Sequence, residues 1–154
     1  MPGSVDFHAF ENREAASRAA AGLLAGWLDD ALGRGLETSA SLVVSGGSTP
    51  GPCFAQLSAK PLDWSRVTVV PSDERWVPAE DPASNEGLIR RQLLRDKAAP
   101  AQLLPFFRDG IDAAQAPGLI EEDLKAVPRP FSATLLGMGE DGHFASLFPD
   151  FAGL

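Results

Sequence analysis

Apolar residues follow a helical spacing near the start of the chain and form short continuous runs farther on. Segment 12–35, NREAASRAAAGLLAGWLDDALGRG, carries alanine, leucine and tryptophan along one face of a predicted helix. Asn12 is the expected N-cap residue, and Gly33 and Gly35 are expected to end the helix. The apolar positions of this face are Ala16, Ala19, Ala20, Leu23, Leu24, Trp27, Leu28 and Ala31.

Three short runs that carry valine, leucine and other apolar residues predict strands. They are 39–47 (SASLVVSGG), 65–76 (SRVTVVPSDERW) and 131–139 (FSATLLGMG). Helical patterns separate them, and these predict helices over 48–60, 84–97 and 118–127.

Local residues predict where each of these later helices begins. Thr49 is expected to cap the helix over 48–60, with Pro50 at its first position, where a missing N–H matters least. Ser84 or Asn85 is expected to open the helix over 84–97. Pro117 is expected to shorten the helix over 118–127.

This alternation of strands and helices predicts an α/β fold, with a three-layer, Rossmann-like arrangement of a mostly parallel sheet and helices on both faces. We expect 1–154 to form a single domain. Ligands of such sheets bind beyond the carboxyl ends of the strands. Those ends carry SGGSTP (45–50), PSDERWVP (71–78) and GMGEDGH (137–143), so we expect them to form one site.

The SGGSTP sequence has two interpretations. Gly46 and Gly47 can adopt positive φ, and with the hydroxyls of Ser48 and Thr49 they would form a phosphate cradle at a helix N-terminus. The alternative is a tight turn followed by an ordinary helix cap. A nucleoside triphosphate site is not expected, because the lysine of a P-loop is missing.

The PSDERWVP sequence is either a solvated charged loop or a ligand-binding loop. In the second interpretation Arg75 binds a phosphate or carboxylate through its planar guanidinium, and Trp76 and Val77 anchor the loop. Arg90 and Arg91 would add positive charge or simply face solvent.

The third strand end spells G-x-G-x-x-G at Gly137, Gly139 and Gly142, the pattern of a dinucleotide-binding turn. Two features argue against that ligand: the carboxylates at 140 and 141 would repel a pyrophosphate, and a proline at 149 stops a long helix. The alternative is a glycine turn that presents Asp141 beside His143. Imidazole exchanges protons near neutral pH, and a carboxylate can orient it, so His143 is a candidate base.

Composition limits the remaining possibilities. The 154 residues carry a formal net charge of −8, so nucleic acid is not an expected partner, and any anionic ligand must be held by local positive groups. Cys53, the single cysteine, is expected to be a buried apolar residue in a reducing, cytoplasmic protein. No apolar run has the length of a membrane span. His8 is expected to have a structural role. A metal site is not expected, because the two histidines of the chain are far apart in the sequence.

Three motifs in this order resemble the 6-phosphogluconolactonase family. They are VVSGGSTP (43–50), SDERWVP (72–78) with SNEGLIR (84–90), and LLGMGEDGHFASLFP (135–149). The wider superfamily includes glucosamine-6-phosphate deaminases and ribose-5-phosphate isomerases. The deaminases share G-x-G-x-D-G-H but continue with Ile-Ala-Phe-Asn-Glu-Pro, whereas this chain continues with FASLFP.

The resemblance implies hydrolysis of 6-phospho-D-glucono-1,5-lactone in the oxidative pentose phosphate pathway, without a metal or organic cofactor and by a monomer. His143 would activate water, with Asp141 as its orienting group. Backbone N–H groups around Gly139 or Gly47 would stabilise the oxyanion. Arg75 and the turn of Gly46, Gly47, Ser48 and Thr49 would hold the phosphate.

Two departures from the family pattern modify these expectations. Phe144 stands where the family commonly has threonine or another small residue, so its ring would pack away from the site or narrow it. The family also implies further strands and helices after residue 149, so we expect a domain that lacks its C-terminal part and is prone to self-association through an open sheet edge. An amino-sugar-phosphate deaminase or isomerase and a non-catalytic sugar-phosphate-binding protein remain as alternatives.

Overall fold

The computed structural model describes residues 5–33 and 38–152. Its helices are α1 (Arg13–Leu32), α2 (Gly51–Ser58), α3 (Asn85–Gln92) and α4 (Ala116–Leu124). Its strands are β1 (Ala40–Val44), β2 (Val67–Pro71), β3 (Gln102–Leu103) and β4 (Ala133–Leu135). Single 3-10 turns lie at Trp64–Arg66, Asp96–Ala98 and Ala113–Gln115.

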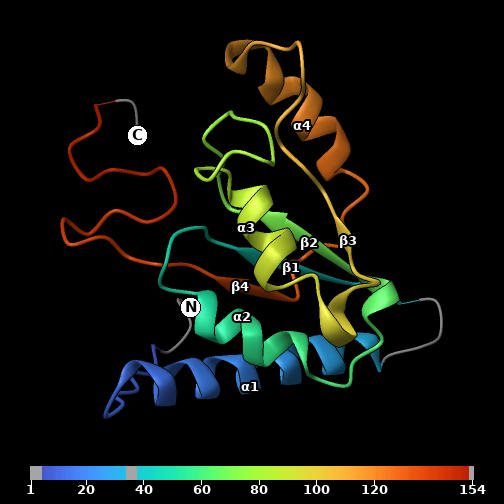
Figure 1. Ribbon diagram of the computed structural model, residues 1–154, viewed down its shortest axis with the longest axis vertical. Helices are drawn as coiled ribbons and strands as arrows, with labels where there is room; N and C mark the ends of the chain where they lie inside the picture. Colours follow the sequence, from blue (N-terminus) through green and yellow to red (C-terminus); the bar gives the residue numbers. More distant parts are fainter. Residues whose placement is uncertain (1–4, 34–37, 153–154) are drawn as a thin grey trace.

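The four strands form one parallel sheet in the order β3-β2-β1-β4 (Figure 1). Leu42 of β1 pairs with Val69 of β2 and with Ala133 of β4, which places β1 at the centre. The predicted α/β fold with a parallel sheet is therefore confirmed. The two-residue strand β3 was not predicted, because its sequence AQLLPFF has no β-branched residue and is interrupted by proline.

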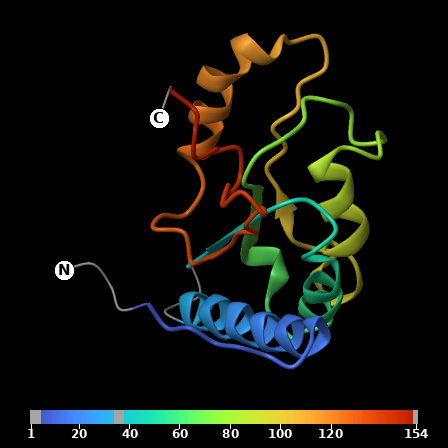
Figure 2. The ribbon, with the colours of Figure 1, turned by 90° about the vertical axis from the view of Figure 1, so that its left-hand side faces the viewer.

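Alternate residues of β1 and β2 enter two different cores. Leu42, Val44, Val67 and Val69 pack with α1, α2 and α3 in the larger core. Val43 and Val70 face the other side, where they meet Val127 and the partly buried Leu124 at the end of α4. Figures 1 and 2 show α1 and α2 along one side of the sheet and α4 well apart from them. Helices thus lie on both faces, as predicted, although the second core is small.

The helix boundaries follow local chemistry, with two corrections. The Asn12 side chain accepts a hydrogen bond from the N–H of Ala15, so the predicted N-cap of α1 is confirmed. Of the two candidates for α3, Ser84 is the N-cap and accepts from the N–H of Gly87. Thr49 is not the cap of α2: the cap residue is Pro50, without a side-chain hydrogen bond, because the helix begins one residue later than predicted. Pro117 does not shorten α4, since a proline in the first turn sacrifices no helical hydrogen bond.

The end of α1 agrees with the sequence where it can be compared. Gly33 is the C-cap and its N–H donates to Asp29 at 2.8 Å, whereas Gly35 lies outside the described residues. Within the described ranges, no helix combines the length and apolar character needed to cross a membrane.

We predict that Leu28→Ala lowers the free energy of unfolding by about 2–5 kcal/mol, because Leu28 is fully buried in α1 and its loss leaves a cavity under the sheet. Leu23→Ala on the same helix is the matched control, since Leu23 is half exposed. It should cost less than about 1 kcal/mol. Urea unfolding of both variants measures the difference, and equal losses would contradict this description of the core.

Candidate active site

The carboxyl ends of β2, β1 and β4 meet at one edge of the sheet, as the sequence predicts. They surround an open cavity of about 370 Å³. The segments after β1, β2 and β4 contribute Ser45, Gly46, Gly47, Thr49, Asp73, Arg75, Leu135, Leu136, Gly137, Met138, Gly139, His143 and Ala145. Helices α1 and α2 with the residue before α2 contribute Arg13, Ala16, Ser17, Ala20, Pro50 and Cys53.

The turn between β1 and α2 presents free backbone amides. Gly47 has a φ of +88°, a left-handed conformation that favours glycine, whereas Gly46 does not take the positive φ predicted for it. Among the described residues, no acceptor pairs with the N–H groups of Gly46, Gly47, Ser48 or Thr49. Ser48 lies outside the cavity lining, unlike the other three. Such a run of unpaired amides is suited to an anion.

Gly46 is required by a close approach. A Cβ at Gly46 would lie 1.7 Å from Oδ1 of Asn85, at the start of α3. Asn85 is only 1% exposed, and its side-chain N–H donates to the carbonyl of Asp73 at 2.8 Å. Its Oδ1 accepts from the Arg75 guanidinium. The asparagine thus joins the turn after β1 to the loop after β2.

Glu74 caps helix α3 across a gap of ten residues in the sequence. Its two carboxylate oxygens accept from the N–H groups of Asn85 and Glu86, each at 2.8 Å, at the positive end of the helix dipole. The Ser84 hydroxyl adds a third contact at 3.3 Å. The interpretation of this segment as a solvated charged loop is therefore wrong for Glu74. The capping role was missed because the partners are distant in sequence.

Asp73 and Trp76 attach the loop after β2 to two other segments of the chain. The carboxylate of Asp73 accepts from the hydroxyls of Ser72 at 2.8 Å and Ser146 at 3.0 Å, which ties it to the segment after β4. The Trp76 indole donates to the carbonyl of Ile111 at 2.9 Å and packs edge-on against Phe107. The predicted anchoring by Trp76 is confirmed.

His143 and Asp141 form a direct pair at the cavity. Nδ1 of His143 lies 2.5 Å from Oδ1 of Asp141, and only His143 belongs to the lining. The hydrogen bond from His143 is the main reason that the pKa of Asp141 is lowered, so the carboxylate stays ionised at neutral pH. With Nδ1 donating to Asp141, Nε2 keeps its lone pair and is the ring atom able to accept a proton.

The glycine turn before His143 makes room for this ring. A Cβ at Gly139 would lie 2.2 Å from Nδ1 and Cε1 of His143. The N–H of Gly139 donates to the carbonyl of His143 at 2.8 Å. This amide is therefore already engaged, so of the two expected oxyanion donors only Gly47 has a free N–H in the described part of the chain, while Gly139 still lines the cavity.

Two phenylalanines near His143 in the sequence have different surroundings. Phe148 stacks on the imidazole with ring centroids 4.6 Å apart, a contact that the sequence did not predict. Phe144 forms a backbone bridge with Leu147, is about half exposed and does not line the cavity. Of the two alternatives for Phe144, the structure has the ring away from the site.

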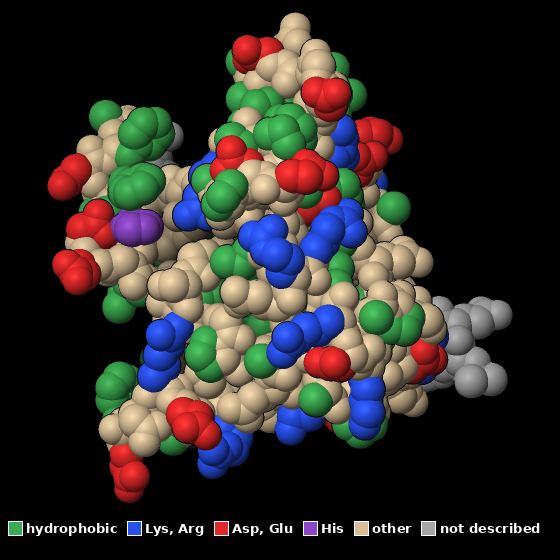
Figure 3. All heavy atoms as spheres, in the orientation of Figure 1, with side chains coloured by type: hydrophobic (Ala, Val, Ile, Leu, Met, Phe, Trp, Pro, Cys, Tyr) green, Lys and Arg blue, Asp and Glu red, His purple; other side chains and the backbone are tan. Residues whose placement is uncertain are grey.

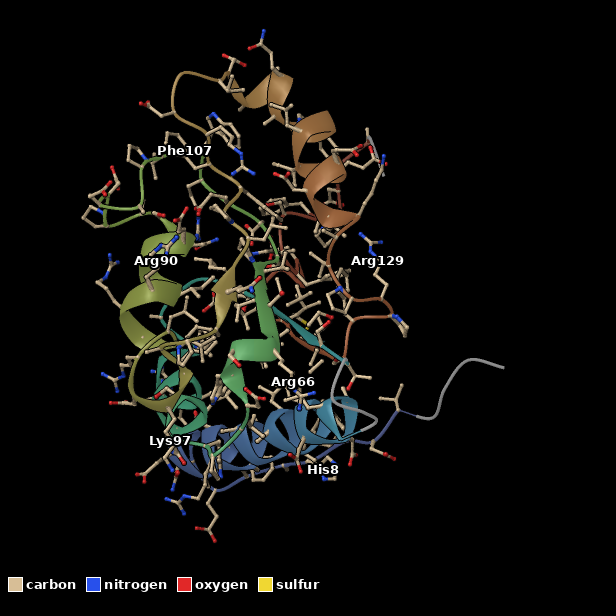
Figure 4. All side chains as sticks on the ribbon, turned by 90° about the vertical axis from the view of Figure 1, so that its right-hand side faces the viewer. His8, Arg66, Arg90, Lys97, Phe107 and Arg129 are labelled. Atoms are coloured by element: carbon tan, nitrogen blue, oxygen red, sulfur yellow. The ribbon has the colours of Figure 1, made fainter. Side chains whose placement is uncertain are left out.

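One basic residue at the cavity was not expected, whereas Arg90 and Arg91 follow the solvent-facing alternative. Arg13 of α1 lines the cavity and was not a sequence candidate, because its contacts lie 35 residues or more away. Arg90, on α3, pairs with Glu86 and, like Arg91, is exposed outside the cavity (Figure 4). Figure 3 shows several basic side chains gathered over the middle of one face. His8 is exposed beside α1, apart from the site (Figure 4).

The described residues include no set of side chains suited to bind a metal ion. Across the part of the chain that the structure describes, no three or more His, Cys, Asp and Glu side chains cluster in a way that could hold a metal ion.

The fold and cavity define a parallel α/β protein whose site lies at the carboxyl edge of the sheet, with a histidine–aspartate pair on one side. Residues 11–154 match the family described as glucosamine-6-phosphate isomerases/6-phosphogluconolactonase, and the chain belongs to this family. The predicted resemblance is thereby confirmed.

Individual relatives support the lactonase side of the family. A 6-phosphogluconolactonase of Pseudomonas aeruginosa is 42% identical over 154 residues, which are 100% of this chain and 64% of that protein. A 6-phosphogluconolactonase of Caulobacter vibrioides is 42% identical over a region that covers 94% of this chain and 61% of that protein. The crystal structure of a 6-phosphogluconolactonase from Shewanella baltica superposes with a TM-score of 0.89 at 40% identity, covering 95% of this chain and 62% of that one. The chain therefore spans less than two thirds of these relatives.

We predict that Gly46→Ala lowers the free energy of unfolding by about 1–3 kcal/mol, because the new methyl group forces the buried Asn85 side chain from its partners. Gly22→Ala on α1 is the control, since nothing lies within 4 Å of its Cβ position and alanine favours a helix. Thermal or urea unfolding compares the two. A Gly46→Ala variant as stable as the parent would show that Asn85 moves freely.

Cys53 offers a prediction about reactivity. Burial raises the pKa of its thiol to about 11, so only about 0.1% is thiolate at pH 8. Alkylation of the native chain by iodoacetamide should be at least about tenfold slower than alkylation of the urea-unfolded chain, and should accelerate as the pH rises toward 11. Mass spectrometry follows the reaction. Rapid labelling of the folded chain at pH 8 would contradict the burial of Cys53.

Proposed function

We propose that this chain carries the catalytic residues of a 6-phosphogluconolactonase, which hydrolyses 6-phospho-D-glucono-1,5-lactone to 6-phospho-D-gluconate. The observation that carries the proposal is the His143–Asp141 pair, with 2.5 Å between Nδ1 and Oδ1, at the wall of a cavity that also contains free amides and arginine. The names of the relatives at 42% identity support the same substrate.

The phosphate of the substrate would bind at the turn after β1. The unpaired N–H groups of Gly46 and Thr49 supply directional donors, and Arg75 supplies a positive charge on the same cavity. A positive wall is needed there because the chain as a whole carries a net charge of −8. Holding the phosphate fixes the position of the lactone carbonyl relative to His143.

The reaction itself needs one base and one acid in succession. Nε2 of His143 takes a proton from water as the water oxygen bonds to the lactone carbonyl carbon. The tetrahedral intermediate then breaks its bond to the ring oxygen, and the imidazolium returns its proton to that oxygen as the hydroxyl forms. Asp141 accepts the Nδ1–H throughout, which holds the tautomer and stabilises the imidazolium. The new carboxylic acid ionises in water.

The oxyanion of the intermediate is best assigned to the turn after β1. Gly139 is unsuited because its N–H is bound to the carbonyl of His143. Gly47 keeps an unpaired N–H at the cavity, so we propose it as an oxyanion donor. A metal or organic cofactor is not required by this mechanism.

The compartment and partners follow from the same chemistry. We propose a cytoplasmic reaction, supported by a single cysteine that is buried and unpaired. A sugar-phosphate lactone is the proposed small-molecule partner, and the lactonase names of the relatives favour it over an amino-sugar phosphate.

We predict that His143→Ala lowers kcat for the lactone by about 10²–10⁴-fold relative to the parent, because both proton transfers lose their carrier. Asp141→Asn should lower kcat while leaving KM nearly unchanged, because the ring loses its orienting carboxylate but the phosphate site is intact. The rate of acid release above the spontaneous rate measures both.

His8→Ala is the matched control, since this exposed histidine lies outside the cavity and should leave kcat unchanged. Undiminished catalysis by His143→Ala would remove it from the mechanism. Calorimetric binding of 6-phosphogluconate by the 154-residue chain without any turnover would instead support a non-catalytic sugar-phosphate-binding protein.

A further inference from the structure

Arg13 lies at the first position of α1 and reaches the turn between β1 and α2. Its Nη2 donates to the carbonyl of Thr49 at 3.1 Å and also to the carbonyl of Ser48. The same guanidinium lines the cavity. A side chain from the first helix is thereby fixed against the turn that we propose as the phosphate site.

These bonds decide which backbone groups of the turn remain available. The carbonyls of Ser48 and Thr49 are occupied by Arg13, while the N–H groups of 46–49 have no acceptor in the ranges that the structure covers. Two carbonyls of the turn are therefore covered by a guanidinium, while the N–H groups of the turn stay free. That polarity favours an anion over a cation.

Arg13 also keeps donors of its own. A guanidinium has N–H groups on three nitrogens, and within the described chain only Nη2 has an acceptor. Arg75 likewise uses a single guanidinium nitrogen within the described residues, donating from Nη1 to the buried Asn85. Arg13 can therefore turn Nε and Nη1 toward a ligand without giving up its contact with the turn.

The charge of the cavity depends on Arg13. Its lining contains Arg13 and Arg75 as cations and Asp73 as the carboxylate. Without Arg13, the charges of Arg75 and Asp73 cancel, in a protein with a net charge of −8. With Arg13, the lining has an excess of one positive charge, which an anionic group at the turn experiences at close range.

We propose that Arg13 is an anion-binding residue of this cavity, which binds the phosphate of the ligand directly and at the same time orients the turn of residues 46–49. The identity of that ligand as a 6-phosphorylated lactone rests on the proposed function, whereas the affinity for inorganic phosphate does not.

The experiment is a titration of the full 154-residue chain with inorganic phosphate, with binding measured by calorimetry or NMR at low and at high salt. Arg13→Gln should raise the Kd for phosphate roughly five- to twentyfold at low ionic strength, because a charge and its hydrogen bonds are lost. The difference from the parent should shrink at high salt, since screening weakens the charged contact. Arg13→Lys should retain part of the affinity and the full salt dependence.

Arg18→Gln on the same helix is the matched control, because Arg18 pairs with Glu14 and lies outside the cavity. It should bind phosphate within about twofold of the parent. The proposal is overturned if Arg13→Gln keeps the parent Kd, or if its loss of affinity is independent of salt and equal in Arg13→Lys, which would indicate a purely structural role. Thermal unfolding of each variant identifies a failure to fold.

The same variants separate this inference from the proposed function. If phosphate binding depends on Arg13 but the lactone is not hydrolysed, the anion site stands and the lactonase proposal fails. If hydrolysis proceeds with an unchanged KM in Arg13→Gln, the lactonase proposal stands and the role of Arg13 is refuted.

Discussion

The contact between Gly46 and the buried side chain of Asn85 holds together the segments that form the cavity. Asn85 begins α3, accepts from Arg75 and donates to the carbonyl of Asp73, so one amide group connects a helix, the loop after β2 and the turn after β1. A buried polar side chain is stable only when its hydrogen bonds are made. Moving α3 or the loop after β2 would therefore leave a buried donor or acceptor of Asn85 unpaired, and the turn after β1 has room there only for glycine.

The two acidic residues of the loop after β2, Asp73 and Glu74, stabilise different parts of the structure. Glu74 is held by the amides at the start of α3, so its negative charge is offset by the helix dipole and is removed from the ligand's surroundings. Asp73 is bound by two serine hydroxyls and ties this loop to the segment that carries His143. An acidic protein can thus keep a cavity that tolerates an anion, because its nearest carboxylates are already hydrogen-bonded and two guanidinium groups line the cavity.

Sequence reasoning succeeded where local patterns determine structure. The period of apolar residues in 12–35 predicted α1, and the three polar strand ends were correctly expected to meet, since parallel strands share one carboxyl edge. It failed where the cause lies far along the chain. Glycine at 46 was explained by backbone freedom, whereas the reason is the approach of Asn85. Arg13 has nothing in its neighbourhood to distinguish it from Arg18, because its role depends on carbonyls 35 and 36 residues away.

The two halves of the site are held by different contacts. The turn after β1 is fixed by Asn85 on one side and Arg13 on the other. The segment that carries His143 extends beyond the last strand and is held by Ser146 on Asp73, by the stacking of Phe148 and by its own glycine turn. Binding energy at the anion site can position the reacting group of a ligand against the histidine, because the ligand itself then bridges the two. If the proposed function holds, removing a wall of the anion site would consequently disturb the alignment of His143 as well as the affinity, although the residues of that wall never touch the lactone carbonyl.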